Sequence, residues 1–192
     1  VGDIVYHDGS ALARLARGAA GQALQMNSGA TAPEWAASAG GGKLLQLVTT
    51  FKSSGWTESV GGDTWSSLIT GLTVTITPSA ADSSVLILWN VGAFSLSAGG
   101  GVNGQLLRDT TPIGVGNPSG SRAQSVWGMF PGVDTSYQGN AAGMFLDVTP
   151  GTSAFVYGMK VGHTSSTSKT IYVNKTSDTT DDFRYPRTGS NI

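Results

Sequence analysis

The hydrophobic residues of this chain come in short runs, separated by turn residues and spaced roughly ten positions apart. Runs of this length and spacing are typical of strands in an antiparallel β-sandwich. They predict strands over residues 44–51, 72–77, 85–91, 104–107, 124–130, 142–148, 154–161 and 170–173. The only helical candidate, residues 11–17, is too short to persist alone in water. The pattern therefore predicts an all-β protein.

Two of these runs indicate which residues lie inside the sandwich. Residues 72–77 alternate strictly between apolar residues and threonines, which predicts a strand with one buried and one wet face. Residues 85–89 are apolar without a break, so we expect a central strand with both faces covered. We therefore place the following residues in the core: Leu72, Val74, Ile76, Leu86, Leu88 and either Phe155 or Tyr157.

The first 36 residues have a different organisation. Their apolar segments are only four to six residues long and are joined by turns, so none of them can bury its own side chains. Residues 37–42 contain only Ala, Ser and Gly, which is the composition of a flexible linker. We therefore predict an N-terminal module over residues 1–36, a linker over 37–42 and a β-sandwich domain over 43–192.

Four sequence blocks in the N-terminal module resemble, in the same order, the shaft-to-head module of bacteriophage tail fibres. They are Gly2-Asp3-Ile4-Val5-Tyr6, Ala11-Leu12-Ala13-Arg14-Leu15, Gly18 through Leu24, and Asn27-Ser28-Gly29 through Trp35. The resemblance implies a homotrimeric virion fibre that attaches the particle to its host, with other virion proteins on the N-terminal side. It also implies that three chains intertwine about an axis lined by Leu12, Leu15, Leu24 and Met26.

Residues 43–192 look like the trimeric, jelly-roll-like head domains that follow this module in phage proteins. Such a head presents its loops to the host, so we expect a surface glycan or a protein receptor to bind there. The loops 116–122 and 130–137 carry ring or guanidinium planes beside hydroxyls and amides, and the receptor-binding candidates are Arg122, Phe130 and Tyr137. The alternative is that Trp127 and Phe130 face the core or the trimer axis.

Composition and charge narrow the classes of partner. Charged residues make up 12% of the chain, about half the usual ~25%, and the formal net charge is −1. Without a basic stripe we expect no nucleic-acid binding. The absence of cysteine excludes disulfides and cysteine-based zinc sites. The longest apolar run falls far short of the ~20 residues of a membrane span, so we expect no membrane insertion. Because the chain begins with Val1, we interpret it as part of a longer polypeptide.

Other chemical motifs in the sequence are weak. Residues 99–104 match G-x-G-x-x-G, but no amphipathic helix follows, so we interpret them as a hairpin loop. His7 and His163 lack a second ligand at metal spacing, although a three-fold axis would bring three copies of one histidine together. The only acidic cluster lacks the spacing of a calcium-binding loop and is expected to be a solvated loop; it comprises Asp178, Asp181 and Asp182. The sequence therefore predicts no cofactor and no metal.

Three functions from different classes fit these features. The first is host recognition by a virion fibre, and the second is a structural fibre or capsid-surface decoration without receptor contact. The third is a glycan-degrading enzyme, but the chain has only two glutamates, Glu34 and Glu58, and no G-x-S-x-G motif or β-helical repeat. We therefore favour a non-enzymatic attachment protein.

Overall fold

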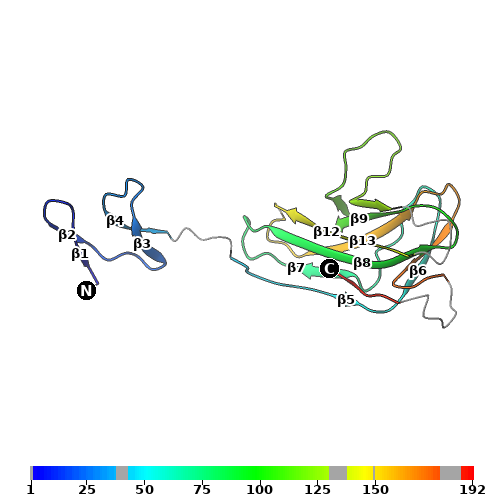
Figure 1. Cartoon of the computed structure of the whole chain (residues 1–192), viewed down its shortest axis with the longest axis horizontal. Coiled ribbons are helices and arrows are strands. Elements are labelled where there is room, and N and C mark those ends of the chain that lie inside the picture. Colours follow the sequence, from blue (N-terminus) through cyan, green and yellow to red (C-terminus); the bar gives the residue numbers. More distant parts are fainter. Residues whose placement is uncertain (1, 38–42, 130–137, 149, 178–186) are drawn as a thin grey trace. The chain divides into compact units, whose positions relative to one another are not determined.

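The computed structural model describes residues 2–37, 43–129, 138–148, 150–177 and 187–192 of the 192 in the chain. These residues form antiparallel strands and contain no helix, so the all-β prediction is confirmed. The chain divides into two compact units, Val1–Leu45 and Gln46–Ile192, which are described separately below (Figure 1).

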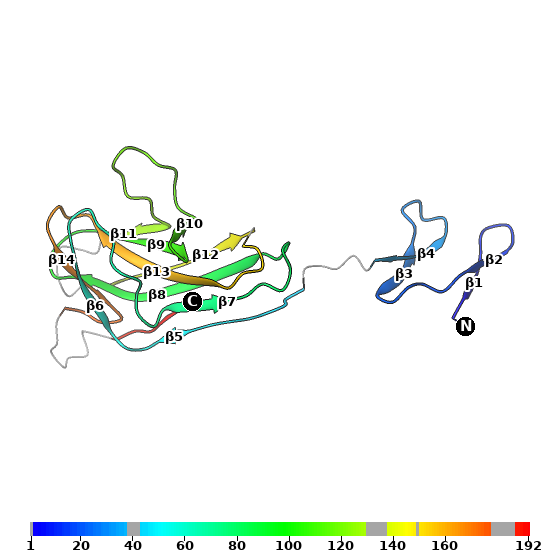
Figure 2. The same cartoon turned by 180° about the vertical axis from the view of Figure 1, so that it is seen from behind.

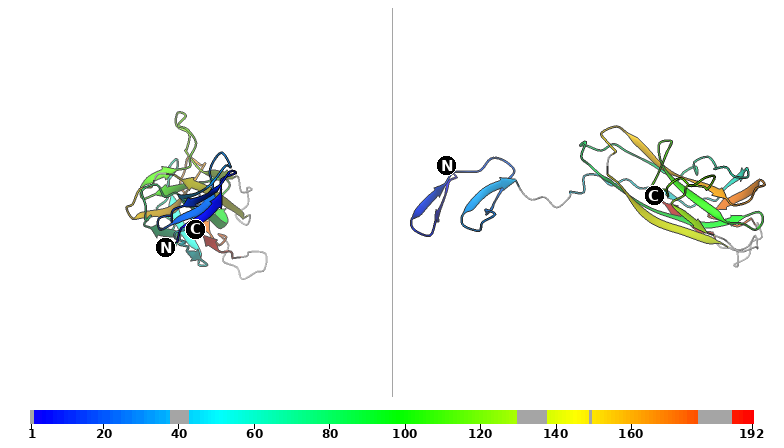
Figure 3. Two further views of the ribbon diagram at one scale, coloured as in Figure 1. Left: turned by 90° about the vertical axis from the view of Figure 1, so that its left-hand side faces the viewer. Right: turned by 90° about the horizontal axis from the view of Figure 1, so that it is seen from above.

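The N-terminal unit consists of two antiparallel hairpins, drawn in blue in Figure 3. Strand β1 (Ile4–His7) pairs with β2 (Leu12–Leu15), and β3 (Gln22–Met26) pairs with β4 (Pro33–Ala37). The carboxylate of Asp8 closes the first turn by accepting hydrogen bonds from the backbone N–H groups of Ala11 and Ser10, each at 2.8 Å. These bonds, first that of Ala11, lower the pKa of Asp8. The indole N–H of Trp35 donates to the carbonyl of Ala16 at 2.8 Å and ties the two hairpins together.

The single chain has no buried core in this unit. Among its described residues, none is buried. Its large apolar side chains are instead 47–77% exposed at four positions, Val5, Leu12, Leu24 and Met26, while Leu15 is half-buried. Isolated two-stranded hairpins are marginally stable in water. The hairpins therefore lack, within one chain, the apolar contacts that would hold them. That Leu12, Leu15, Leu24 and Met26 line a trimer axis stays a prediction.

The C-terminal unit contains two antiparallel sheets (Figures 1 and 2). The first, called here the β9 sheet, has the order β10 (Thr111–Ile113), β9 (Val102–Arg108), β13 (Phe155–His163) and β7 (Thr73–Ile76), and β11 (Trp127–Met129) also pairs with β9. The second, called the β8 sheet, has the order β5 (Phe51–Lys52), β15 (Ser190–Asn191), β8 (Val85–Leu96), β14 (Lys169–Val173) and β6 (Trp56–Val60), and β12 (Gly139–Asp147) also pairs with β8.

The two sheets face each other across one hydrophobic core. Buried side chains from both of them form a single cluster, which includes Ile87, Phe94, Leu106 and Val173. The rings of Phe94 in β8 and Trp127 in β11 lie with their centroids 4.6 Å apart, so the sheets touch directly. The core thus fixes the position of every strand that carries the sites described below.

Strand β8 is central, as predicted, but only one of its faces is covered along residues 85–89, whereas both faces are buried along residues 91–96. Phe94 pairs with Gly139 of β12 and with Val173 of β14, which places neighbouring strands on both of its edges. The prediction that Leu86 and Leu88 lie in the core is wrong, because both are 57% exposed. Their neighbours along the strand are buried instead: Val85, Ile87 and Trp89. An unbroken apolar run does not reveal which face is covered, and along residues 85–89 only the face toward the β9 sheet is.

The remaining core predictions agree with the structure. Leu72 is fully buried, and Tyr157 is the more deeply buried of the two aromatic candidates in β13. Val74, Ile76 and Phe155 are partly buried and pack against the same cluster. The alternation of residues 72–77 thus identified the inner face of β7 correctly, since Tyr157 lies opposite Val74 and Phe155 lies opposite Ile76.

Candidate functional site

A row of residues across the β9 sheet defines the candidate site. Asn103 of β9 pairs with Gly162 of β13 on one side and with Gly128 of β11 on the other. Gly162 is in turn bridged to Trp65. Directly opposite residues of an antiparallel pair point to the same face, and the neighbouring Val102 is in the core. Trp65 and Asn103 therefore stand on the outer face of the sheet, on either side of Gly162.

Gly162 lets the Thr64 carbonyl and the Trp65 ring pack closely onto strand β13. A Cβ atom at this position would lie 3.1 Å from the carbonyl oxygen of Thr64 and 3.1 Å from Cε3 of the Trp65 ring. Gln105 stands two residues beyond Asn103, on the same face of β9. Its Nε2 donates to the carbonyl of Gln124 at 3.1 Å. The side chain of Gln105 therefore connects the sheet to the loop that covers it.

That loop, residues 114–126, projects from the C-terminal unit between β10 and β11 (Figure 2). It is held at its base by hydrogen bonds from Nε2 of Gln124 to the carbonyl of Gly116 at 2.7 Å and from the N–H of Val126 to the carbonyl of Gly104 at 2.9 Å. Between the loop and the sheet lies a cavity of about 600 Å³. Its lining comprises Asp63, Thr64, Trp65, Asn103, Gln105, Ser121, Arg122, Ala123, Gln124, Ser125, Gly162, His163 and Thr164.

The cavity is polar but carries no net charge. It is lined by one carboxylate, that of Asp63, and one guanidinium, that of Arg122. Within the described part of the chain, no hydrogen bond or ion pair engages the side chains of Asp63, Asn103 or Arg122. These three side chains are therefore available to a ligand.

His163 is not available in the same way. Its Nε2 lies 2.9 Å from the carbonyl of Val60, and its Nδ1 accepts a hydrogen bond from the N–H of Ser165 at 3.2 Å. These partners fit a neutral imidazole that carries its proton on Nε2, and they occupy both ring nitrogens. His7 likewise accepts a hydrogen bond on Nδ1, from the N–H of Gly9 at 3.0 Å. Among the described residues, no group of three His, Cys, Asp or Glu side chains is arranged to hold a metal ion.

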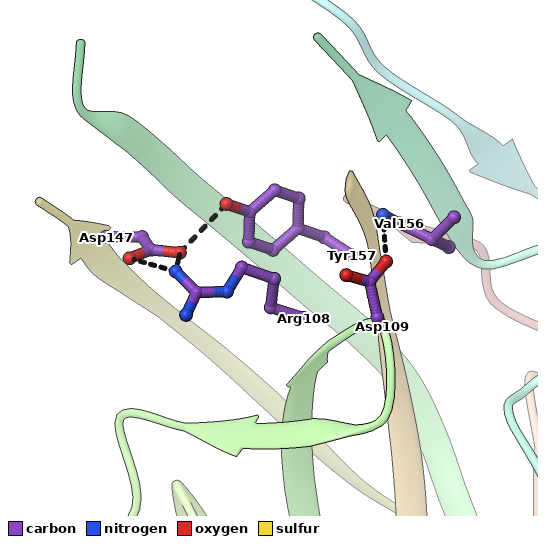
Figure 4. Close-up of polar contacts among 5 residues, drawn as sticks. All are labelled: Arg108, Asp109, Asp147, Val156 and Tyr157. Carbon is purple, nitrogen blue, oxygen red and sulfur yellow. Dashed lines mark hydrogen bonds and ion pairs between the residues drawn. The ribbon is translucent and has the colours of Figure 1, made fainter. Parts of the chain in front are cut away.

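A second polar cluster joins the two sheets (Figure 4). Nη1 of Arg108 in β9 donates to both carboxylate oxygens of Asp147 in β12, at 3.0 and 2.8 Å. The hydroxyl of Tyr157 in β13 donates to the same carboxylate at 2.9 Å. Burial, and next the hydrogen bond to Asp147, raises the pKa of the Tyr157 hydroxyl above its usual value. Asp147 and Tyr157 are buried and Arg108 is partly buried, so we interpret the cluster as a structural link between the two sheets.

Of the three predicted receptor-binding residues, the structure describes only one. Arg122 lines the cavity, whereas Phe130 and Tyr137 lie outside the described residues. Trp127, which the sequence places either at an exposed receptor-binding surface or facing the core or trimer axis, is half-buried and packs against Phe94 in the core. The acidic cluster of Asp178, Asp181 and Asp182 also lies outside the described residues.

Sequence reasoning missed the residues that form most of the cavity. Trp65, Asn103 and Gln105 come from separate segments, and only strand pairing brings them together. No local pattern distinguishes them from other polar or aromatic residues. The glycine at position 162, directly after the apolar run 154–161, was the one available signal, because a strand glycine often marks a close approach of another group.

A second exposed surface lies on the outer side of the β8 sheet. Leu88 pairs with Met144, and Leu86 pairs with Leu146, so these side chains form two adjacent cross-strand pairs on one face. Together with Val148 they are 50–72% exposed, and none of them is charged. We call these five residues the β8–β12 apolar face.

Within the described part of the chain, the structure contains no helix that is long and apolar enough to cross a membrane. No protein-family model matches the sequence, and no curated protein matches it either. The resemblance of the four N-terminal sequence blocks to phage tail fibres stays a prediction from the sequence.

Proposed function

We propose that the chain is a homotrimeric fibre component of a bacteriophage virion whose C-terminal unit attaches the particle to the host cell surface. One observation carries the trimeric part of this proposal. No described residue of the N-terminal unit is buried, although the unit contains Val5, Leu12, Leu24 and Met26. Two hairpins with such exposed side chains need neighbouring chains to cover them. The tail-fibre resemblance gives the number of chains as three.

The β8–β12 apolar face supports the same assembly. Its side chains are large, contiguous and uncharged, which is a surface that proteins normally cover. Copies of the same chain are the partner we propose for it, because an uncharged face can pack against an identical one without charge repulsion. In this arrangement the C-terminal unit is a trimeric, jelly-roll-like head.

The cavity beside Arg122 favours attachment over decoration alone. A surface decoration needs only contacts to the virion, whereas a polar cavity with unengaged side chains suits a further ligand. The alternative function is a structural fibre or a capsid-surface decoration without receptor contact. We propose no catalytic role, because the buried Asp147 carboxylate is fully occupied by Arg108 and Tyr157.

Adsorption to cells tests this proposal. The full chain, labelled with a fluorophore on its lysines, is mixed with a panel of bacterial strains, and bound fluorescence and released sugar are measured in the same samples. We expect saturable binding to a subset of strains and no release of sugar. Lack of binding to every strain would favour the decoration alternative. Release of sugar would show that the chain is an enzyme.

A further inference from the structure

We propose that the cavity between Trp65 and Asn103 is a binding site for a neutral saccharide. This inference rests on the proposed attachment function and names the ligand class of its site. The volume of about 600 Å³ falls within the roughly 300–1,000 Å³ that is usual for small-molecule sites. It combines one indole ring with several carboxamide and hydroxyl groups.

Trp65 supplies an apolar surface in the lining of the cavity. Its indole ring is half-buried, and its six-membered ring packs over Gly162, whose lack of a side chain makes room for it. The part of the ring that lines the cavity is open to a ligand. The C–H groups of a sugar ring form a flat apolar patch that packs against such an indole surface. The pairing of Trp65 with Gly162 holds the ring in position before any ligand arrives.

The two carboxamides match the hydroxyl groups of a sugar. A sugar hydroxyl both donates and accepts hydrogen bonds, and a carboxamide offers two donors and one acceptor oxygen. Neither end of the Asn103 amide is engaged within the described residues, and Gln105 uses its Nε2 for the carbonyl of Gln124. Asn103 and Gln105 stand two residues apart on the same face of β9, and both line the cavity. They can therefore contact different hydroxyls of one ligand.

The charges favour a ligand without net charge. Asp63 and Arg122 contribute one negative and one positive charge, and the partners of His163 fit a neutral ring. A phosphate or an acidic sugar would be attracted by Arg122 alone and repelled by Asp63. A neutral polyol can use both groups as hydrogen-bond partners at once.

A peptide fits the lining less well. Peptide and protein ligands usually anchor through an apolar or aromatic side chain buried in a pocket. Among the described residues of the lining, Trp65 and Ala123 are the only apolar side chains, and the other side chains carry hydroxyl, amide, imidazole or charged groups. The lining therefore offers stacking and hydrogen bonds but no apolar pocket, which favours a saccharide.

Saturation-transfer NMR on the full chain tests the site directly. The probes are the methyl glycosides of glucose, galactose, mannose and N-acetylglucosamine. We expect transfer to the ring C–H protons of at least one glycoside. Asn103→Ala should weaken its binding roughly five- to ten-fold, the loss expected for one or two hydrogen bonds. Trp65→Phe should weaken it less than Trp65→Ala, because it keeps an aromatic ring.

The matched control is Asn117→Ala, the same change at an exposed position of the loop that does not line the cavity. It should bind the glycoside like the unaltered chain, and all variants should have the same melting temperature as the parent, except that Trp65→Ala is expected to be lower. Absence of transfer to every glycoside would overturn the proposal. So would equal binding by Asn103→Ala and Asn117→Ala.

Adsorption to cells separates this inference from the attachment proposal. Periodate destroys sugar diols on the cell surface, and protease destroys protein receptors. We expect periodate to abolish adsorption and protease to leave it unchanged. Adsorption that only protease abolishes, and that Asn103→Ala does not alter, would overturn the saccharide site and leave attachment standing. Glycoside binding without adsorption to any strain would overturn the attachment proposal and leave the saccharide site standing.

Discussion

Asp147 connects the two sheets through a single carboxylate. Arg108 and Tyr157 reach it from β9 and β13, while Asp147 itself ends β12 (Figure 4). The loss of one donor should therefore lower the free energy of unfolding less than the loss of the acceptor that both donors share. Tyr157→Phe leaves the ion pair intact and should lower the free energy of unfolding by about 1 kcal/mol. Asp147→Asn leaves the Arg108 guanidinium without its counter-charge and should cost about 2 kcal/mol, because that guanidinium is 25% exposed and partly solvated.

Urea unfolding at one fixed protein concentration measures the free energy of unfolding of the parent and of both variants. The pH dependence of the difference between the parent and Tyr157→Phe provides the control. The pKa of Tyr157 in the folded chain is raised above its ordinary value of 10.0, so its contribution is complete below that pH and is lost as the pH rises further. The stability difference of about 1 kcal/mol between the parent and Tyr157→Phe should therefore disappear as the pH rises above 10. A difference that stays constant with pH would contradict the assigned hydrogen bond.

At the scale of strands, residues 85–89 of β8 and the part of β12 that pairs with them present one covered and one open face. Leu88 lies on the open face, so Leu88→Lys should barely change the fold of one chain. We expect it to shift the assembly toward smaller species, because a charge then lies in the apolar face between copies. Thr75→Lys is the matched control, since Thr75 is an exposed strand position in the other sheet. Sedimentation velocity compares the two variants, and equal sedimentation would exclude this face as an interface.

The long apolar runs in the sequence correctly predicted strands. A strand with few apolar residues, however, was not predicted. The runs at 85–91 and 154–161 correspond to β8 and β13, whose inner residues fill the core. Strand β6, with the sequence Trp-Thr-Glu-Ser-Val, was not predicted because only its two end residues are apolar and buried. The predicted strand at 44–51 exists only at its end, in β5, because the preceding leucines are exposed rather than packed.

The candidate site was less predictable than the fold. Arg122 was found from the composition of its loop, which is a local property. Trp65 and Asn103 meet only because β9 and β13 pair in a particular register and a bridge extends that row to Trp65. Register over such sequence distances depends on the packing of the whole unit, and short-range patterns do not contain it.

At the scale of the whole molecule, both units expose apolar side chains that a single chain does not cover. In the N-terminal unit these are Val5, Leu12, Leu24 and Met26, and in the C-terminal unit they form the β8–β12 apolar face. Burial of such surface is the main favourable contribution to association. Self-association would cover the exposed apolar side chains of both units with a single kind of partner, other copies of the chain.

The mass of the full chain in solution tests the account most directly. Light scattering coupled to size-exclusion chromatography measures it without assumptions about shape. The proposal predicts a single species of about 59 kDa, three times the chain mass of 19.6 kDa, at a concentration of about ten micromolar. A species of 19.6 kDa under these conditions would contradict the account, because the N-terminal hairpins would then have no core.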